Sequence, residues 1–379
     1  MLLEFGLRNF FSFKEGASLS LRLDANCPES ISRKRDFTHV LCVKGANGSG
    51  KTQLLKGLAF LSHFCTNSFA SEPEETIGVS SFYDSEEPSQ FYAEFKINED
   101  FYRYELETTD TEVRRETIFQ TKTRKRKVLE RIGNELTVKT RPFANLDKIK
   151  IRKNASIIST AHQYELNELD DIYRFFNLMI ANVHIGGLHE EPMSMDTVSN
   201  FLATHEKVFG FVKKFIRECD VGVSNIEIST FKNREGKEEF FPVFFHKVNG
   251  QDLPVIDMAE SSGTKTLFRN LASYYYTLNS GGILIVDELD MNLHPHILPK
   301  LVNLFLDPEI NSNDAQFIFS THDSEILNML GRYRTYLVAK EENESYVYRL
   351  DEIPGDILRN DRPIRPIYNE GRIGGVPRL

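Results

Sequence analysis

The chain has 379 residues, of which 40% are hydrophobic and 27% are charged, and its formal net charge is −9 at pH 7. This length is enough for one large or two average domains with a well-buried core, which excludes a small scaffold held together by disulfides. No apolar run approaches the ~18 residues that span a bilayer, the first residues lack the pattern of a secretory signal, and the four cysteines form no CxxC pair. The sequence therefore favours a protein of the reducing cytosol without a membrane span.

The charge is distributed unevenly along the chain. Residues 113–153 contain 14 Lys or Arg and four acids, so this segment has a net charge of +10 and the rest of the chain has −19. Its densest part is TKTRKRK at residues 121–127. Two interpretations stay open. The segment is either a solvated hairpin whose basic tip avoids edge pairing, or a contact for nucleic acid or an acidic partner, because clustered Lys and Arg release condensed counterions when they bind phosphates.

Patterns in the N-terminal part predict strands and one helix. Apolar alternation over residues 2–13 and 17–23 predicts two strands, and the apolar run 38–43 predicts a third that ends at a glycine-rich loop. Apolar residues then recur at helical spacing over residues 54–64. Between residues 91 and 138, short segments rich in β-branched and aromatic residues alternate with polar turns. They predict an antiparallel meander that contains the basic tip.

The remainder of the chain predicts helices followed by buried strands. Helical periodicity predicts a helical insert over residues 165–219, short strands follow between 225 and 258, and a further helix is expected over 263–278. The runs GGILIVDE and AQFIFSTHD are continuously apolar until they end in polar residues, which is typical of strands buried on both faces of a parallel sheet. We therefore expect an α/β fold with a mixed or parallel core sheet, an antiparallel β meander and a helical insert.

A phosphate-binding loop follows the strand predicted at residues 38–43. It matches the pattern GxxxxGK[ST] and lies between a predicted strand and a predicted helix. In such a loop, successive N–H groups and the helix N-terminus face the phosphates. Lys51 would neutralise the β and γ oxygens and Thr52 would bind magnesium, so ATP and Mg²⁺ are the expected cofactors. The loop consists of Gly45, Ala46, Asn47, Gly48, Ser49, Gly50, Lys51 and Thr52.

Two carboxylates end a predicted buried strand further along the chain. Residues 283–286 are apolar and lead into Asp287 and Glu288, which resembles a Walker B strand. Asp287 would hold the metal through water, since a hard cation prefers oxygen ligands. Glu288 would orient or deprotonate the attacking water. The alternative is an acidic strand end that caps a following helix.

Together these motifs resemble the ABC-class P-loop ATPases, and the resemblance covers nearly the whole chain. ESSGTK at residues 260–265 resembles a divergent LSGG signature, in which Ser261, Ser262 and Gly263 would bind nucleotide. It departs from that pattern at its first position, which is Glu rather than Leu, and it keeps one glycine of the pair. The alternative is a plain helix N-cap.

Three further segments resemble elements of the same class. LDMNLHP, which contains Asp290, resembles the D-loop, and FSTHD, which contains His322, resembles the switch segment whose imidazole reaches the γ-phosphate. Gln163, where the predicted meander gives way to the helical insert, is the candidate for the Q-loop, with Gln90 as its competitor.

Within the ABC class, the spacing and order of the motifs indicate which family the chain resembles. Lys51 and Asp287 are 236 positions apart, which disfavours a transporter subunit, and the insert lacks the sustained heptads and CxxC hook of SMC and Rad-type ATPases. The NFFSF start, the motifs above and the closing EGRIGGVPRL are similar to OLD-like ATPases of phage-defence operons, including the ATPase components of Rlo, AbiL and PARIS-type systems. The resemblance implies an ATP-hydrolysing sensor or scaffold. It also implies a separate effector, a nuclease or toxin, because the 57 residues after His322 leave no room for a TOPRIM nuclease domain.

The resemblance also implies an assembly, because in ABC-class sites the signature of one protomer closes over ATP on the phosphate loop of another. We expect a cytoplasmic homodimer or higher homo-oligomer. A single ABC-type ATPase domain is expected over residues 1–379, with an N-terminal lobe (1–164), a helical insert with linking strands (165–250) and a C-terminal lobe that carries the signature, Walker B and switch histidine (251–379). The alternatives are a DNA repair or chromosome-maintenance clamp and, less favoured, a transporter motor.

Overall fold

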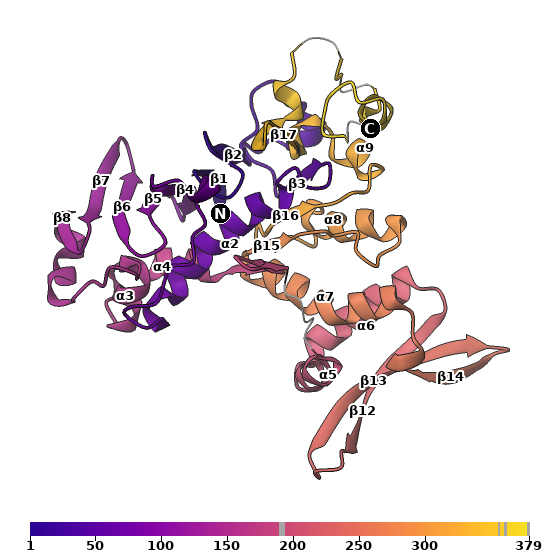
Figure 1. Ribbon diagram of the computed structural model, residues 1–379. Coiled ribbons are helices and arrows are strands. Elements are labelled where there is room, and N and C mark those ends of the chain that lie inside the picture. The colour runs from indigo at the N-terminus through magenta and orange to yellow at the C-terminus, as the bar shows by residue number, and fades with distance from the viewer. Residues whose placement is uncertain (189–193, 355–356, 360–361, 377–379) are drawn as a thin grey trace.

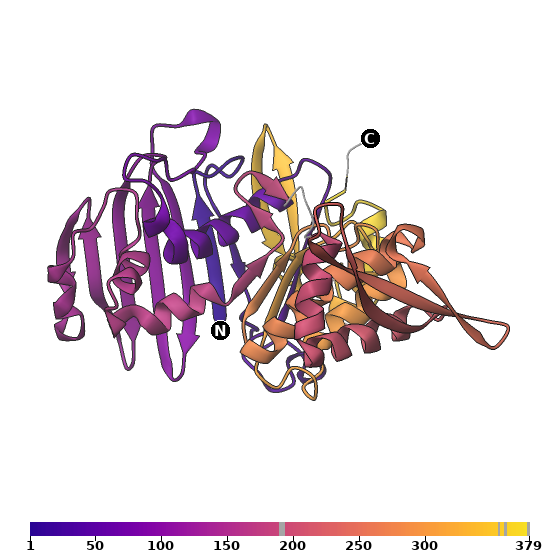
Figure 2. The ribbon, with the colours of Figure 1, turned by 90° about the horizontal axis from the view of Figure 1, so that it is seen from below.

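A computed structural model describes residues 1–188, 194–354, 357–359 and 362–376. Two large β-sheets dominate the molecule (Figure 1), and Figure 2 shows the N-terminal sheet on the left and the second sheet, with most of the helices, on the right. Within the described residues, no helix combines the length and the apolar character that crossing a membrane requires.

The core sheet has six strands: β3 (Val40–Gly45), β9 (Met179–Ala181), β15 (Ile283–Val286), β16 (Gln316–Ser320), β17 (Thr335–Glu341) and β18 (Glu344–Arg349). Their order is β18-β17-β3-β16-β15-β9, and all neighbours are parallel except β17 and β18. The apolar runs are buried on both faces, as expected for parallel strands. In β3, Leu41 and Val43 belong to one hydrophobic cluster, whereas Val40 and Cys42 belong to the other.

The N-terminal sheet is the predicted meander, extended by the first two strands of the chain. It consists of β1 (Leu2–Arg8), β2 (Ala17–Ser20), β4 (Ser89–Ile97), β5 (Asp100–Thr108), β6 (Val113–Thr121), β7 (Lys125–Ile132) and β8 (Glu135–Lys139). Every neighbouring pair is antiparallel, in the order β2-β1-β4-β5-β6-β7-β8. Alternate residues of β4 are buried, so one face of this sheet packs on the core. The basic tip, residues 121–127, comprises the end of β6, the turn that follows and the start of β7.

The helices form two groups, one on each face of the core sheet. α2 (Lys51–Asn67), α3 (Ile157–Gln163) and α4 (Asp170–Asn177) pack between the core sheet and the N-terminal sheet. α5 (Met195–Thr204), α6 (Glu206–Cys219), α7 (Ser262–Ser280) and α8 (Leu298–Leu306) pack on the other face. A small antiparallel sheet accompanies this second group, formed by β12 (Val223–Lys232), β13 (Glu238–Val248) and β14 (Gln251–Ile256).

The remaining elements are short. α9 (Ile326–Leu330) and α10 (Ile364–Asn369) form a third hydrophobic cluster with β17. The other α-helix and strands of the described residues are α1 (Glu29–Ser32) and the hairpin of β10 (Val183–His184) and β11 (Gly187–Leu188), and short 3-10 helices connect several elements. The predicted α/β fold, with its mixed core sheet and antiparallel meander, is confirmed.

The region around the predicted helical insert differs from expectation in two ways. β9 lies inside residues 165–219, where only helices were expected, because Met179–Ala181 pairs with β15 and completes the core sheet. A run of three residues is too short to show any periodicity. β14 pairs with β13 across the boundary predicted at residue 250, so the strands after the insert form one sheet rather than parts of two lobes.

Candidate nucleotide-binding site

The phosphate loop joins the carboxyl end of β3 to the N-terminus of α2. Gly50, the N-cap residue of α2, has φ +114°, which L side chains rarely adopt. Gly45 lies so close to β17 that a Cβ atom there would collide with the carbonyl oxygen of Val338. The backbone geometry therefore requires glycine at both positions.

Lys51 is buried at the start of α2. Its Nζ donates hydrogen bonds to the carbonyl oxygens of Gly45 (3.0 Å) and Ala46 (3.1 Å). Burial lowers the pKa of Lys51, and the nearby carboxylates of Asp287 and Glu288 act in the opposite direction. The ammonium group thus lies over the loop and within the field of the Walker B carboxylates.

Asp287 follows β15 and is only 1% exposed. Its Oδ1 accepts a hydrogen bond from Ser320 Oγ, whereas its Oδ2 is buried without a hydrogen-bond partner. Buried carboxylate oxygens are normally paired, and leaving one unpaired is costly. The free oxygen therefore indicates a position where a ligand belongs.

Glu288 has φ +53°, the left-handed region that few non-glycine residues occupy. Two hydrogen bonds hold this turn to β16: Glu288 N donates to Ser320 Oγ (2.9 Å) and Leu289 N donates to Ser320 O (2.9 Å). Ser320 therefore orders both Walker B residues, although the sequence patterns did not single it out. Its position directly before Thr321 and His322, at the end of a buried strand, is the signal that could have identified it.

Asn182 is a second residue of the site that the sequence patterns did not single out. It follows β9, and its side chain bonds to the backbone of Asp287 in both directions, with Nδ2 donating to Asp287 O (2.9 Å) and Oδ1 accepting from Asp287 N (2.7 Å). Asn182 thus fixes the Walker B turn from the neighbouring strand end. The available signal is the short apolar run LMIA that ends in a polar residue.

The D-loop and the switch segment meet at the carboxyl ends of β15 and β16. The N–H of His322 donates to both carboxylate oxygens of Asp290 (3.1 and 3.2 Å), and the carbonyl oxygen of His322 accepts from Lys44 Nζ (2.8 Å). The imidazole itself is exposed. The structure therefore brings Asp290 and His322 together.

The signature residues lie on a different layer of the molecule. Ser261 is the N-cap of α7, where its Oγ accepts a hydrogen bond from Thr264 N (3.1 Å). α7 and α2 pack on opposite faces of the core sheet (Figure 1). A Cβ atom at Gly263 would lie 3.1 Å from the carbonyl oxygen of Asn292, so the signature adjoins the D-loop. Ser261, Ser262 and Gly263 thus do not share a layer with the phosphate loop of their own chain.

Gln163 is not brought to the site, so the expectation of a Q-loop residue there is wrong. It is the exposed last residue of α3, and α3 begins at the far end of α2, where Ser156 N donates to Ser68 Oγ (2.8 Å). The 17 residues of α2 span about 25 Å at 1.5 Å per residue, which separates that end from the phosphate loop. Its competitor Gln90 lies on β4 and donates to Glu107 (3.2 Å). Sequence order alone does not show which end of α2 a later segment meets.

The residues at the loop and strand ends fit a magnesium–nucleotide complex. Asp287 offers an unpaired oxygen, and Thr52, half-buried at the second position of α2, would add a hydroxyl oxygen. Mg²⁺ prefers a few such oxygen ligands together with phosphate oxygens and water. The orphaned Oδ2 is the observation that favours a metal-binding role for Asp287.

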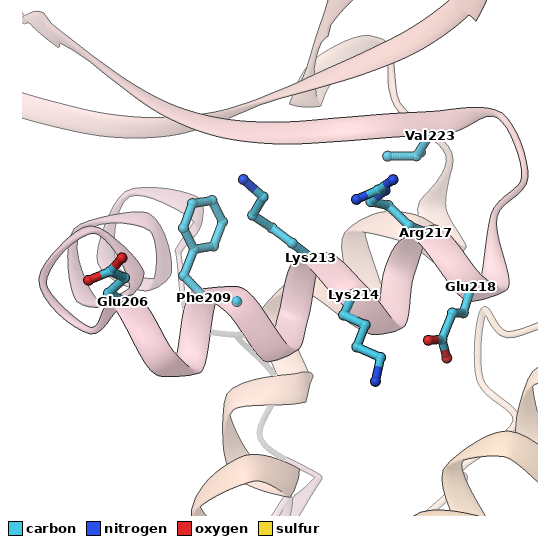
Figure 3. Close-up of a pocket in the computed structure, with 8 residues that line it drawn as sticks. Glu206, Phe209, Lys213, Lys214, Arg217, Glu218 and Val223 are labelled. Atoms are coloured by element: carbon cyan, nitrogen blue, oxygen red, sulfur yellow. The ribbon is translucent and has the colours of Figure 1, made fainter.

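A cavity of about 750 Å³ lies elsewhere, between α6 and β12. Figure 3 shows Phe209, Lys213 and Arg217 extending from α6 toward the overlying strand, and Val223 also lines the cavity. None of the predicted nucleotide-binding residues lines it. The predicted site is therefore the surface formed by the phosphate loop and the strand ends, not this cavity.

Comparisons with known proteins found a family and a solved structure to which the chain is similar. Residues 40–328 match the family described as "AAA domain, putative AbiEii toxin, Type IV TA system", and the chain belongs to this AAA-domain family. The solved structure titled "Structure of the recombination mediator protein RecF-ATPrS in RecFOR pathway" is similar over 92% of this chain and 98% of that chain, with 14% sequence identity and a TM-score of 0.37. No curated protein matches the chain.

Proposed function

We propose that the chain binds MgATP and hydrolyses ATP. The observation that carries the proposal is a convergence at the carboxyl ends of the neighbouring strands β3, β16 and β15. Lys51 follows β3 through the phosphate loop, His322 follows β16, and the pair Asp287–Glu288 follows β15. Phosphoryl transfer requires positive charge on the phosphates and a positioned water, and these side chains supply both next to a helix N-terminus.

Each role follows from where the side chain lies. Lys51 would meet the β and γ oxygens, and its burial strengthens that attraction because fewer water molecules screen it. Thr52 and Asp287 would hold magnesium, which supplies charge neutralisation when bound. Glu288 would orient or deprotonate the attacking water, and the exposed His322 imidazole would reach the γ-phosphate.

ATP turnover by the purified protein tests this proposal. Lys51→Ala should lower MgATP binding or turnover at least about 100-fold, because it removes the charge that meets the transferring phosphate. Lys34→Ala is a matched control, because this lysine forms an exposed ion pair with Glu29. A correctly folded Lys51→Ala variant with undiminished hydrolysis would disprove the phosphate-loop assignment.

We further propose that the complete site forms between copies of the chain, as a homodimer or higher homo-oligomer. The support is the placement of Ser261 and Gly263 on the opposite face of the core sheet from α2. A signature in that position would approach a phosphate loop of a second copy more readily than its own. Light scattering with and without ATP tests this.

The biological role we propose is control of a separate effector, a nuclease or toxin, in antiviral defence in the cytoplasm. The family description, which names a toxin and a toxin–antitoxin system, supports this role. Mass-spectrometric identification of proteins that co-purify from infected and uninfected cells tests it. Recovery of a nucleotide-dependent effector supports the role, and recovery of a membrane permease would replace it with a transporter motor.

A DNA repair or chromosome-maintenance clamp is the second candidate. It is favoured by the basic tip, in which Lys122 and residues 124–127 are all exposed. Only Lys122 and Lys127 among these form ion pairs in the part of the chain that the structure describes, with Asp100 and Glu130 respectively. Binding of nucleic acid at low salt discriminates this candidate from an effector-controlling ATPase that contacts only protein.

A further inference from the structure

Lys44 is a buried cation with no role in the proposed chemistry. It is the residue before Gly45 on β3 and is 1% exposed. Its Nζ donates to the carbonyl oxygen of His322 (2.8 Å) and lies 5.0 Å from the centre of the Tyr368 ring. Burial lowers the pKa of Lys44, whereas the carboxylates of Asp290 and Asp323 favour its charged form. A buried charge is kept only where partners compensate it, so these contacts matter to the fold around His322.

The backbone of His322 is held at both its N–H and its carbonyl oxygen. Lys44 binds its carbonyl oxygen, and Asp290 accepts its N–H. One of these groups belongs to the strand that leads into the phosphate loop and the other to the D-loop. The clamp therefore sets where the exposed imidazole stands relative to the phosphate loop.

Tyr368 connects this clamp to the end of the chain. It lies on α10 and is buried, and its hydroxyl donates to the carbonyl oxygen of Gly375 (3.0 Å). Gly375 has φ +70° and packs against β17, where a Cβ atom would lie 3.1 Å from Leu337. On the other side of the same turn, the hydroxyl of Tyr348 donates to Ile373 O (2.7 Å). The turn at residues 373–375 is thus bound by two tyrosine hydroxyls. Of these two tyrosines, Tyr368 is the one whose ring contacts Lys44.

We propose that Lys44 and the ring of Tyr368 are positioning residues that hold the backbone of His322 for ATP hydrolysis. This inference rests on the proposed function. The ring covers one side of the ammonium by a cation–π contact, which leaves its N–H groups directed at His322 O. Without the Tyr368 ring, Lys44 can adopt other rotamers and the backbone at His322 can shift. A displacement of about 1 Å at a reacting group can lower a rate about 100-fold.

Four single variants and one double variant, assayed for kcat and KM with MgATP, test the inference. Lys44→Met and Tyr368→Leu should each lower kcat about tenfold and change KM less than about twofold, because nucleotide binding at the loop is untouched. Tyr368→Phe keeps the ring and should retain near-normal kcat. Tyr348→Phe loosens the other side of the same turn without touching Lys44, and should also retain it. The double variant Lys44→Met/Tyr368→Leu should be no slower than the more impaired single variant, since both act on one contact.

Hydrogen exchange at the His322 amide, measured without nucleotide, separates this inference from the proposed function. Exchange should be faster in Tyr368→Leu than in wild type and unchanged in Tyr348→Phe. If wild-type protein hydrolyses no ATP, the proposed function fails, yet the exchange data still decide whether the ring of Tyr368 holds the backbone of His322. Unchanged exchange in Tyr368→Leu would overturn the inference. Equal loss of kcat in Tyr368→Phe and Tyr368→Leu, or equal loss in Tyr348→Phe, would also overturn it, because the ring would then not be the operative group.

Discussion

Two buried carboxylates, one in each large sheet, are equally inaccessible but differ in their partners. Glu116 on β6 and Asp287 after β15 are each 1% exposed. Glu116 forms an ion pair with Arg131 Nε (2.8 Å) and accepts hydrogen bonds from Tyr104 Oη (2.9 Å) and Ser156 Oγ (2.7 Å). Asp287 has one partnered oxygen and one orphaned oxygen.

This difference shows how burial alone fails to distinguish structure from function. A fully paired carboxylate such as Glu116 holds elements together, here β6, β7 and the start of α3, and leaves no capacity for a ligand. An incompletely paired one such as Asp287 costs free energy in the absence of a ligand, and that cost is recovered when a ligand binds. Glu116 thus stabilises the N-terminal sheet, whereas the free oxygen of Asp287 can accept a ligand at the carboxyl end of β15.

Arg131→Met should give the largest loss of stability. It leaves the Glu116 charge buried without its cation, which costs about 3–5 kcal/mol of unfolding free energy. Urea unfolding monitored by circular dichroism measures this. Arg114→Met is the matched control, because Arg114 pairs with Glu112 at the surface (2.9 Å) and should lose no more than about 1 kcal/mol. Similar losses in the two variants would show that the buried Glu116–Arg131 pair stabilises the fold no more than a surface ion pair does.

Asp287→Asn should impair ATP turnover strongly and stability little. Turnover should fall at least about 100-fold, because the magnesium ligand is lost, whereas unfolding without nucleotide should change by no more than about 1 kcal/mol, since a half-paired charge is replaced by a neutral amide. Wild-type protein should gain about 2.7 kcal/mol from MgATP at 100 times its Kd, and the variant should gain much less. A destabilisation as large as that of Arg131→Met would instead make Asp287 a structural residue.

Glu288→Gln, at the residue next to Asp287, should lower ATP hydrolysis without preventing nucleotide binding. The neutral side chain should slow water attack while nucleotide still binds, so ATP stays trapped and a closed dimer accumulates. Light scattering should show a dimer with ATP for the variant and a monomer for the Lys51→Ala/Glu288→Gln double variant, which cannot bind the phosphates. A monomeric Glu288→Gln variant with wild-type turnover would contradict both the role of Glu288 and the proposed dimer.

Charge reversal in the basic tip should have the smallest effect on the free energy of unfolding. Reversing Lys122, Arg124, Lys125, Arg126 and Lys127 to Glu should leave unfolding nearly unchanged, in contrast to the buried Arg131. If the tip binds nucleic acid, the same change should weaken binding and flatten its salt dependence, by up to ~0.9 in log–log slope per lost phosphate contact. Reversing Lys213, Lys214 and Arg217 on α6 is a control of similar charge on another surface. No binding by wild-type protein at low salt would leave the tip as a solvated hairpin.

Local patterns were sufficient for much of the fold and for part of the site. The phosphate loop follows from eight consecutive residues, and its strand and its helix follow from the apolar patterns directly before and after it. The meander was predictable for the same reason, since antiparallel neighbours are also neighbours in sequence. The resemblance also singled out Asp290 and His322, which the structure brings into contact.

What the sequence determined by itself was therefore short-range: the loop, the acidic end of β15, the meander, and the alternation of apolar runs that makes the fold α/β. The tertiary structure decided which distant segments complete the site. Asn182 reaches Asp287 only because a three-residue strand closes the edge of the core sheet, and Gln163 misses the loop because α3 packs on the far end of α2. Ser261 likewise lies on the face opposite α2 because α7 packs there. The physical reason is that parallel pairing and helix packing join residues far apart in sequence, and the free energy of those contacts depends on the whole core and not on any local pattern.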